Sequence, residues 1–230
     1  MNLHPYQLTI LEKMMYNPKL KFSNLQIKGL TSKHFNYHLK KLVENRLLEK
    51  SQHGYVLTKS GKDYVGKVDE KNMQPEIQPK VSVALYITRI VAGKREYLVT
   101  RRLKQPYYGK VGGVSGKVKF GEKFQEAGER ELLEETGLTG KFTFTHIHHK
   151  LAHGPEKPLH YNQDNIFVIF LVTDTKGDLI TSTTEQENFW ISEADLRKRD
   201  DLFNTLLEFI GYAQKADGKF TEGVIMEKGY

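Results

Sequence analysis

The hydrophobic period changes once along this 230-residue chain, and that change constrains the fold more than any other feature. Before residue 69, apolar residues recur at helical spacing, as Leu8, Leu11 and Met14 do. Over residues 81–88, apolar residues alternate with polar or small ones, which indicates a half-buried strand. Residues 69–80 contain two prolines and no apolar period, as is typical of a linker. The sequence therefore predicts two domains, 1–68 and 81–230.

Charge is divided unevenly between these domains. Residues 1–68 carry 12 Lys and Arg against 4 Asp and Glu, whereas residues 69–230 carry 23 against 24. The net basicity of the chain thus lies in its first third. This asymmetry favours a polyanion as partner of the first domain, and the alternative is an ordinary basic domain.

Composition excludes several classes of protein. The chain has no cysteine, so disulfide scaffolds, thiolate zinc sites and cysteine nucleophiles are excluded. No apolar run approaches the roughly 18 residues of a transmembrane helix, and the first residues lack the pattern of a signal peptide. We therefore expect a cytoplasmic protein without a membrane partner.

The first domain shows the pattern of helices followed by a hairpin. Pro5 suits the first turn of one helix, and Thr31 or Ser32 could cap a later one. Residues 47–50 and 55–58 indicate two strands around a turn that contains glycine, and a short helix follows. This succession over residues 4–68 resembles the winged-helix family of DNA-binding domains.

The resemblance implies that the third helix enters the major groove of duplex DNA. Its candidate DNA-binding residues are Ser32, Lys33, Asn36, Tyr37 and Lys40, because Asn and Lys can read bases while Lys, Ser and Tyr can hold phosphates. Winged helices also make protein contacts, so packing on the second domain and a homodimer remain alternatives.

A glycine-rich stretch in the second domain leads into a carboxylate-rich helix, predicted over residues 123–136. Glu131, Glu134 and Glu135 stand at i, i+3 and i+4, so they share one face. A divalent cation would relieve their mutual repulsion, and carboxylates without His or Cys suit Mg²⁺ or Mn²⁺. The plainer interpretation of an acidic helix is a solvated face.

Loop and helix together follow one strict pattern. Five residues separate Gly116 from Glu122, seven more lead to Arg130, and the pattern ends at Gly137 and Leu138. The pattern resembles the Nudix box at every specified position, and the resemblance covers roughly residues 80–215. It implies an α/β/α sandwich with a mixed sheet, so the whole chain is expected to be α+β. It also implies hydrolysis of a nucleoside diphosphate linked to another moiety, by attack of water at phosphorus.

The resemblance also implies roles by position. Glu134 and Glu135 would bind Mg²⁺ or Mn²⁺ together with the backbone carbonyl beside Gly116. Glu131 would bind metal or position the base, and Arg130 would form the ion pair that orients loop and helix. Many members have alanine at the position of Gly128. Glycine instead of alanine costs this helix about 1 kcal/mol of stability but removes no carboxylate.

Other side chains are weaker candidates. Glu187, or Glu185, precedes Trp190 and could be a further metal ligand or the general base. The candidate substrate-binding residues are Arg101, Arg102, Lys104 and Lys110 for phosphates, and Tyr107 and Tyr108 for stacking on a base. Histidines 146 and 148 would share a strand face, but we expect substrate-loop or surface roles for them rather than a metal site.

The sequence therefore favours a metal-dependent hydrolase, a member of the Nudix family, with a nucleotide-type substrate and a possible DNA-binding domain. One alternative is a nucleotide-sensing transcriptional regulator with little or no hydrolase activity. Another is a nucleotide-pool or RNA-end enzyme whose first domain only dimerises or grips substrate.

Overall fold

The computed structural model describes residues 3–69, 73, 75–154 and 161–226. The chain forms two compact units, Met1–Ile77 and Gln78–Tyr230. Val68 and Met73 are buried in the core of the first unit, so the chain stays packed on that unit into the segment expected to be a linker. No helix within the described ranges is long and apolar enough to cross a membrane.

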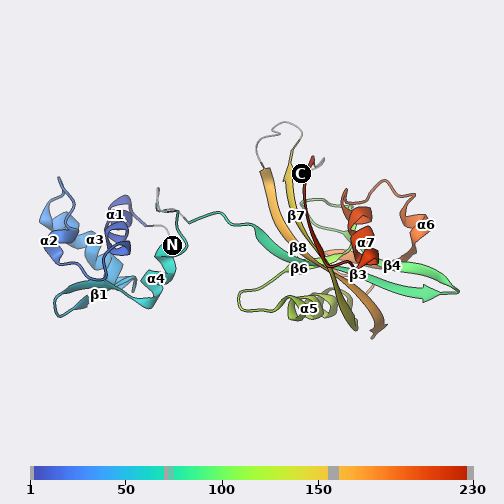
Figure 1. The fold of residues 1–230 in the computed structure, drawn as a ribbon. Coiled ribbons are helices and arrows are strands. Elements are labelled where there is room, and N and C mark those ends of the chain that lie inside the picture. The colour runs from blue at the N-terminus through green and yellow to red at the C-terminus, as the bar shows by residue number, and fades with distance from the viewer. Residues whose placement is uncertain (1–2, 70–72, 74, 155–160, 227–230) are drawn as a thin grey trace. The chain divides into compact units, whose positions relative to one another are not determined.

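The first unit is built from helices around one apolar core (Figure 1). Its elements are α1 (Pro5–Met15), α2 (Phe22–Leu25), α3 (Ser32–Glu44), β1 (Leu48–Ser51), β2 (Gly54–Leu57) and α4 (Lys59–Val65). Thr31 caps α3, because its side chain accepts a hydrogen bond from the backbone N–H of His34. Leu11, Phe35 and Leu42 are fully buried in the core. The elements follow the order that the sequence predicts.

The hairpin of the first unit depends on a close approach of backbone. β1 and β2 are antiparallel, and Leu20 bridges to Tyr55 on the outer side of β2. Gly54 has φ +147°, and a Cβ there would lie 2.5 Å from the carbonyl oxygen of Leu20. Only glycine fits this turn without a shift of the backbone.

The second unit is built on one mixed sheet. Its strands are β3 (Lys80–Val91), β4 (Lys94–Arg102), β5 (Val111–Gly112), β6 (Val114–Lys117), β7 (Thr139–His153), β8 (Tyr161–Lys176), β9 (Gln186–Ser192) and β10 (Lys219–Met226). The strand order is β10-β7-β8-β3-β4-β5, while β6 pairs with β3 and β9 with β4. The pairs β3/β8 and β7/β10 are parallel, and the others are antiparallel. This confirms the mixed sheet expected from the sequence.

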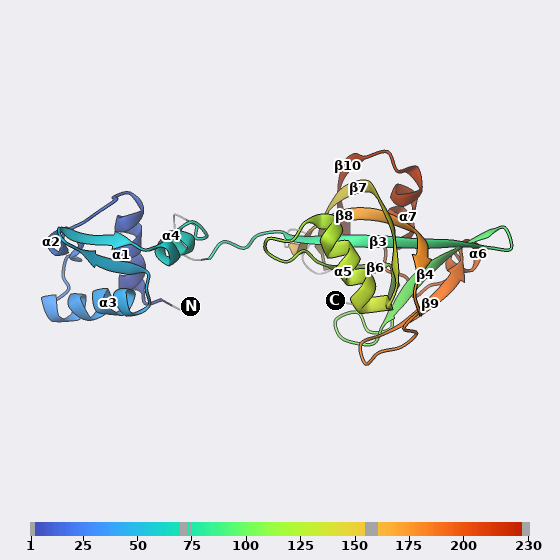
Figure 2. The ribbon, with the colours of Figure 1, turned by 90° about the horizontal axis from the view of Figure 1, so that it is seen from below.

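Helices cover both faces of this sheet, as Figures 1 and 2 show. The alternation in β3 divides the two cores: Val83, Leu85 and Ile87 pack with α5 (Phe124–Thr136), whereas Ala84 and Tyr86 pack with α7 (Leu206–Lys215). The short helix α6 (Glu193–Leu196) contributes to the core on the α7 side. The layers are therefore helix, sheet and helix.

The strand β10 was not anticipated from the sequence. It runs parallel to β7, with Lys219 opposite His146 and Met226 opposite His153. Phe220, Val224 and Met226 are exposed, whereas Thr221, Gly223 and Ile225 are half-buried, so burial along β10 does not follow hydrophobicity as it does in the usual half-buried strand. Only the tertiary structure therefore identifies β10 as a strand at the edge of the sheet.

Candidate functional sites

The carboxylate-rich helix α5 has well-defined ends. At its start the carboxylate of Glu126 accepts from the backbone N–H of Lys123 at 3.1 Å and pairs with the Lys123 ammonium, and Gly137 ends it in the left-handed conformation with φ +73°. Ala127 and Leu132 are fully buried against the sheet. The apolar face therefore fixes the helix in rotation, and the glutamates lie on its other side.

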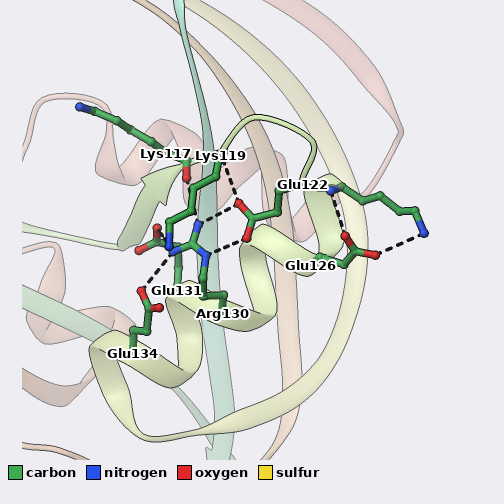
Figure 3. A network of polar contacts seen from close by, with 8 residues as sticks. Lys117, Lys119, Glu122, Glu126, Arg130, Glu131 and Glu134 are labelled. Carbon is green, nitrogen blue, oxygen red and sulfur yellow. Dashed lines mark hydrogen bonds and ion pairs between the residues drawn. The ribbon is translucent and has the colours of Figure 1, made fainter.

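Arg130 lies at the centre of this polar face (Figure 3). Its Nε and Nη2 atoms donate to the two carboxylate oxygens of Glu122 at 2.7 and 2.9 Å. Its Nη1 atom donates to Glu131 at 2.7 Å and to Glu134 at 3.1 Å. Its Nη2 atom also donates to the carbonyl of Lys117 at 3.1 Å. One guanidinium thus ties the loop before α5 to the helix.

The carboxylates of this network differ in their electrostatics. Hydrogen bonds from Arg130 and from the backbone N–H of Lys119 lower the pKa of Glu122 to about 2. Burial, and then the negative charge of Glu131, raise the pKa of Glu135 above its usual value. A bound cation would offset both causes at Glu135, because it would stabilise the charged carboxylate.

Gly116 is in direct contact with the carboxylate of Glu131. A Cβ at Gly116 would lie 1.8 Å from Cδ of Glu131, so any other residue there requires the carboxylate or the backbone to move. Glu131 is itself buried, with 8% of its surface exposed. The glycine thus brings the backbone of β6 against the carboxylates of α5.

These groups fit a hard divalent cation. Carboxylate and carbonyl oxygens are the ligands that Mg²⁺ and Mn²⁺ prefer. In this structure Glu131 and Glu134 pair with Arg130, and no preassembled group of three metal-ligating side chains occurs in the described part of the chain. A metal would therefore bind carboxylates that Arg130 already contacts through one oxygen each.

The two acids before Trp190 have different surroundings. Glu187 pairs with Arg101 at 3.0 Å, and its neighbours Gln186 and Asn188 donate to the carbonyl oxygen of Glu135. Alternation along β9 therefore directs Glu187 to the face of the sheet opposite α5. Glu185 forms an ion pair with Lys104. The positive charge of Lys104 in turn acts on Glu135.

A pocket of about 360 Å³ adjoins Gly116. It opens on the α7 side of the sheet, where Tyr86 and Phe209 form part of its wall. Lys150 of β7 and Asn165 of β8 also line it. The volume lies within the range of small-molecule sites. Gly116 therefore separates the pocket from the carboxylates by the width of one strand.

The structure brings only part of the predicted substrate-binding set to this pocket. Arg102 and Tyr107 line it. Arg101 pairs with Glu187, and Nζ of Lys110 donates to the carbonyl of Leu202 at 3.4 Å. Tyr108 is 62% exposed and does not line the pocket.

Sequence reasoning missed the polar side chains that β7 and β8 contribute. Gln163, Asn165 and Phe167 share a face of β8 by simple alternation, which is a signal that could have been used. Their position beside Lys80 and Ser82 depends on the parallel pairing of β8 with β3. That pairing is set by tertiary structure.

Comparison with known families agrees with this geometry. A sequence model described as NUDIX domain matches residues 79–210, which is more than half of the chain. The chain belongs to the NUDIX domain family. A second model, described as a domain of unknown function (DUF7347), matches residues 4–68.

Solved structures share the fold of the NUDIX domain. One of them is the NUDIX domain of Shewanella oneidensis NrtR, complexed with ADP ribose. It superposes with a TM-score of 0.53 at 15% identity, and the match covers 69% of this chain and 97% of the NrtR chain. The MutT protein from Bacillus halodurans superposes with a TM-score of 0.53 at 16% identity and covers 66% of this chain and 93% of its own. At these identities the likeness concerns the fold alone.

Three histidines of β7, at positions 146, 148 and 149, hold β10 in place. Thr221 Oγ1 lies 2.9 Å from Nε2 of His146 and 2.8 Å from Nδ1 of His148. The His146 ring stacks on Tyr212 of α7, with 4.1 Å between centroids. His149 contacts the carboxylate of Glu222 at 3.0 Å. These contacts give the three histidines a structural role at the sheet edge.

In the first unit, the candidate DNA-binding residues all lie on α3. Lys33, Asn36, Tyr37 and Lys40 follow the spacing i, i+3, i+4 and i+7, so they form one stripe, and Ser32 precedes it in the first turn. Except for the half-buried Asn36, they are exposed. The opposite face of α3 is buried in the core.

Proposed function

We propose that the NUDIX domain hydrolyses the pyrophosphate bond of a nucleoside diphosphate linked to another moiety, with Mg²⁺ or Mn²⁺. The observation that carries this proposal is the contact between Gly116 and the Glu131 carboxylate. It places the glutamate face of α5 directly against the backbone of β6, next to a pocket of ligand size.

The residues divide the work as follows. Glu131, Glu134, Glu135 and the backbone carbonyl next to Gly116 would hold the metal. When bound, the metal supplies neutralisation of phosphate charge and activation of water. Arg130 is a positioning residue, because its guanidinium fixes Glu131 and Glu134 relative to the loop. The pocket beyond Gly116 would hold one end of the substrate.

Of the two acids before Trp190, Glu185 is the better candidate for the general base. Its partner Lys104 acts electrostatically on Glu135, whereas Glu187 pairs with Arg101 on the other face of the sheet. Glu185→Gln should therefore slow turnover more than Glu187→Gln. Wild-type turnover in Glu185→Gln would remove Glu185 from the mechanism.

The hydrolase proposal is tested with a nucleotide panel that includes ADP-ribose, oxidised nucleoside triphosphates, dinucleoside polyphosphates and nucleotide sugars. Product release should require Mg²⁺ or Mn²⁺. Glu134→Gln and Glu135→Gln should each reduce turnover by at least about 100-fold, the scale on which loss of one charge-stabilising group slows an enzyme. Glu129→Gln is the matched control, because Glu129 is exposed on the same helix outside the acidic face. Wild-type turnover in both site variants would refute the assignment.

A second candidate function is nucleotide sensing. It is favoured by the ion pairs of Arg130 with Glu131 and Glu134, which occupy two of the three carboxylates. The ADP-ribose bound to the NrtR domain supports a nucleotide-type ligand for this fold. If no nucleotide of the panel releases product, and ADP-ribose raises the melting temperature of the protein, sensing would be favoured over hydrolysis.

We further propose that the first unit is a winged helix that binds duplex DNA through α3. The proposal is supported by the exposed stripe that includes Lys33 and Lys40 and by the excess of positive charge in residues 1–68. Binding should weaken steeply with salt, because phosphate contacts release counterions. The double variant Lys33→Gln/Lys40→Gln should flatten this salt dependence. The pair Lys59→Gln/Lys62→Gln on α4 is the charge-matched control, and an equal effect of both pairs would assign the binding to charge alone.

A further inference from the structure

The charged side chains that line the pocket beside Gly116 in the described part of the chain are all positive. Its cationic lining residues are Lys80, Arg102, Lys117 and Lys150. None of the lining residues that the structure describes is acidic. The carboxylates of α5 lie beyond Gly116, on the other side of β6. Two regions of opposite charge therefore meet at one glycine.

The register of the sheet arranges two of these lysines around an amide. Asn165 of β8 pairs with Lys150 of β7 on one side and with Lys80 of β3 on the other. Paired residues on neighbouring strands point to the same face. The outer two strands of such a row are about 10 Å apart, because neighbouring strands lie about 4.8 Å apart. The row is thus ammonium, amide, ammonium on the floor of the pocket.

Lys150 is buried, with 5% of its surface exposed. The attraction between an ammonium group and an anion is stronger where water is excluded. The organic part of a ligand has its own surface here, since Tyr86, Phe167 and Phe209 also line the pocket. The lining therefore suits a ligand with both an apolar or ring-shaped part and an anionic group.

We propose that this pocket binds a phosphate-bearing end of the substrate, with Lys150 and Lys80 on either side of the Asn165 amide. This inference rests on the proposed hydrolase function and narrows it. The substrate would be a nucleoside diphosphate derivative that carries a further phosphate ester away from the scissile bond. A nucleotide sugar with an uncharged far end would make no charge-assisted contact with the lysine row.

The test is a binding measurement that does not depend on hydrolysis. The full-length chain in EDTA is titrated calorimetrically with ribose 5-phosphate and ribose, and with AMP and adenosine. Each phosphate ester should bind at least about 10-fold more tightly than its neutral counterpart, as a charge-assisted hydrogen bond implies. Preference in the ribose pair alone would identify a sugar phosphate end, and preference in the adenosine pair alone a nucleotide end.

Single substitutions then show which lysine is responsible for the preference for phosphate esters. Lys150→Met should remove it, and Lys150→Arg should retain part of it because the charge remains. Lys80→Met tests the other end of the row at an exposed position, where unfolding is not expected. Lys176→Met is the control, because Lys176 is exposed on β8 outside the pocket.

Equal binding of esters and neutral counterparts by the wild-type chain would overturn the inference, as would a preference that survives in a folded Lys150→Met variant. Phosphate-selective binding without hydrolysis of any nucleotide would leave this inference standing and remove the hydrolase. Hydrolysis of a nucleotide without phosphate-selective binding would support the hydrolase and overturn this inference.

Discussion

Gly116→Ala is the sharpest test of the site geometry. A Cβ at this position would lie 1.8 Å from Cδ of Glu131. Ordinary carbon contacts need about 3.5–4.0 Å, so the carboxylate or the backbone of β6 must move by about 2 Å. A misplacement of about 1 Å at a reacting centre can reduce the rate about 100-fold. We therefore expect turnover to fall at least about 100-fold.

The fold should survive this change. Overpacking of a well-packed site costs about 1–3 kcal/mol, which is less than the stability of a typical domain. Turnover of the best substrate at saturating Mg²⁺ is the assay, and urea denaturation measures the free energy of unfolding. Gly211→Ala is the control, because a Cβ at Gly211 has no atom within 4 Å.

A double-mutant cycle separates this contact from a general effect on the loop. If Gly116→Ala acts by displacing the Glu131 carboxylate, it should add little to the effect of Glu131→Ala. Additive losses would place the effect elsewhere in β6. A folded Gly116→Ala protein with wild-type turnover would refute the reasoning altogether.

Three further outcomes are expected. Gly128→Ala should destabilise the protein by about 1 kcal/mol in urea denaturation despite its better helix propensity, because the new Cβ would lie 2.8 Å from the Phe142 ring; a stabilised variant would contradict this. Arg130→Lys should lower turnover about 10- to 100-fold and raise the Mg²⁺ concentration required, since lysine cannot reproduce the fork of a guanidinium; an unchanged Mg²⁺ dependence would argue against the positioning role. The carboxylate of Glu222, and then that of Asp164, raise the pKa of His149 from 6.5. The stabilisation from these contacts, about 1 kcal/mol, should be complete below pH 6.5 and lost as pH rises through the raised pKa. Thermal unfolding of wild type and His149→Gln should therefore differ at pH 6 and converge at high pH; a difference that is independent of pH would refute this sign.

Local sequence patterns determined the division of this protein into two parts and the arrangement of the carboxylates on one helix. The change of period separated a helical segment from a sheet-forming one, because side chains repeat every 3.6 residues in a helix and every two in a strand. The spacing of Glu131, Glu134 and Glu135 placed them on one helix face, and Gly137 ended that helix by its access to positive φ. These features depend on neighbours within one or two turns, which the sequence displays directly.

Other features were decided only where distant segments meet. Gly128 reads as a helix defect in the sequence, yet in the structure its lack of a side chain makes room for Phe142 of β7. The sequence put Glu187 before Glu185 as a candidate, and in the structure the pairing of β9 with β4 directs Glu187 to Arg101. Contacts of this kind depend on register, which the sequence does not display.

The pocket shows most clearly which features depend on local sequence and which depend on tertiary structure. Its neighbour Gly116 belongs to a motif of 23 residues that sequence alone identified, because one loop and one helix carry it. Lys80, Lys150 and Asn165 come from three separate strands, and they form one row only because β8 pairs with β3 and β7 in a particular register. The sequence by itself thus determined which carboxylates share one helix face. The sheet decided which charges line the pocket, since strand pairing across long separations is a property of the folded chain.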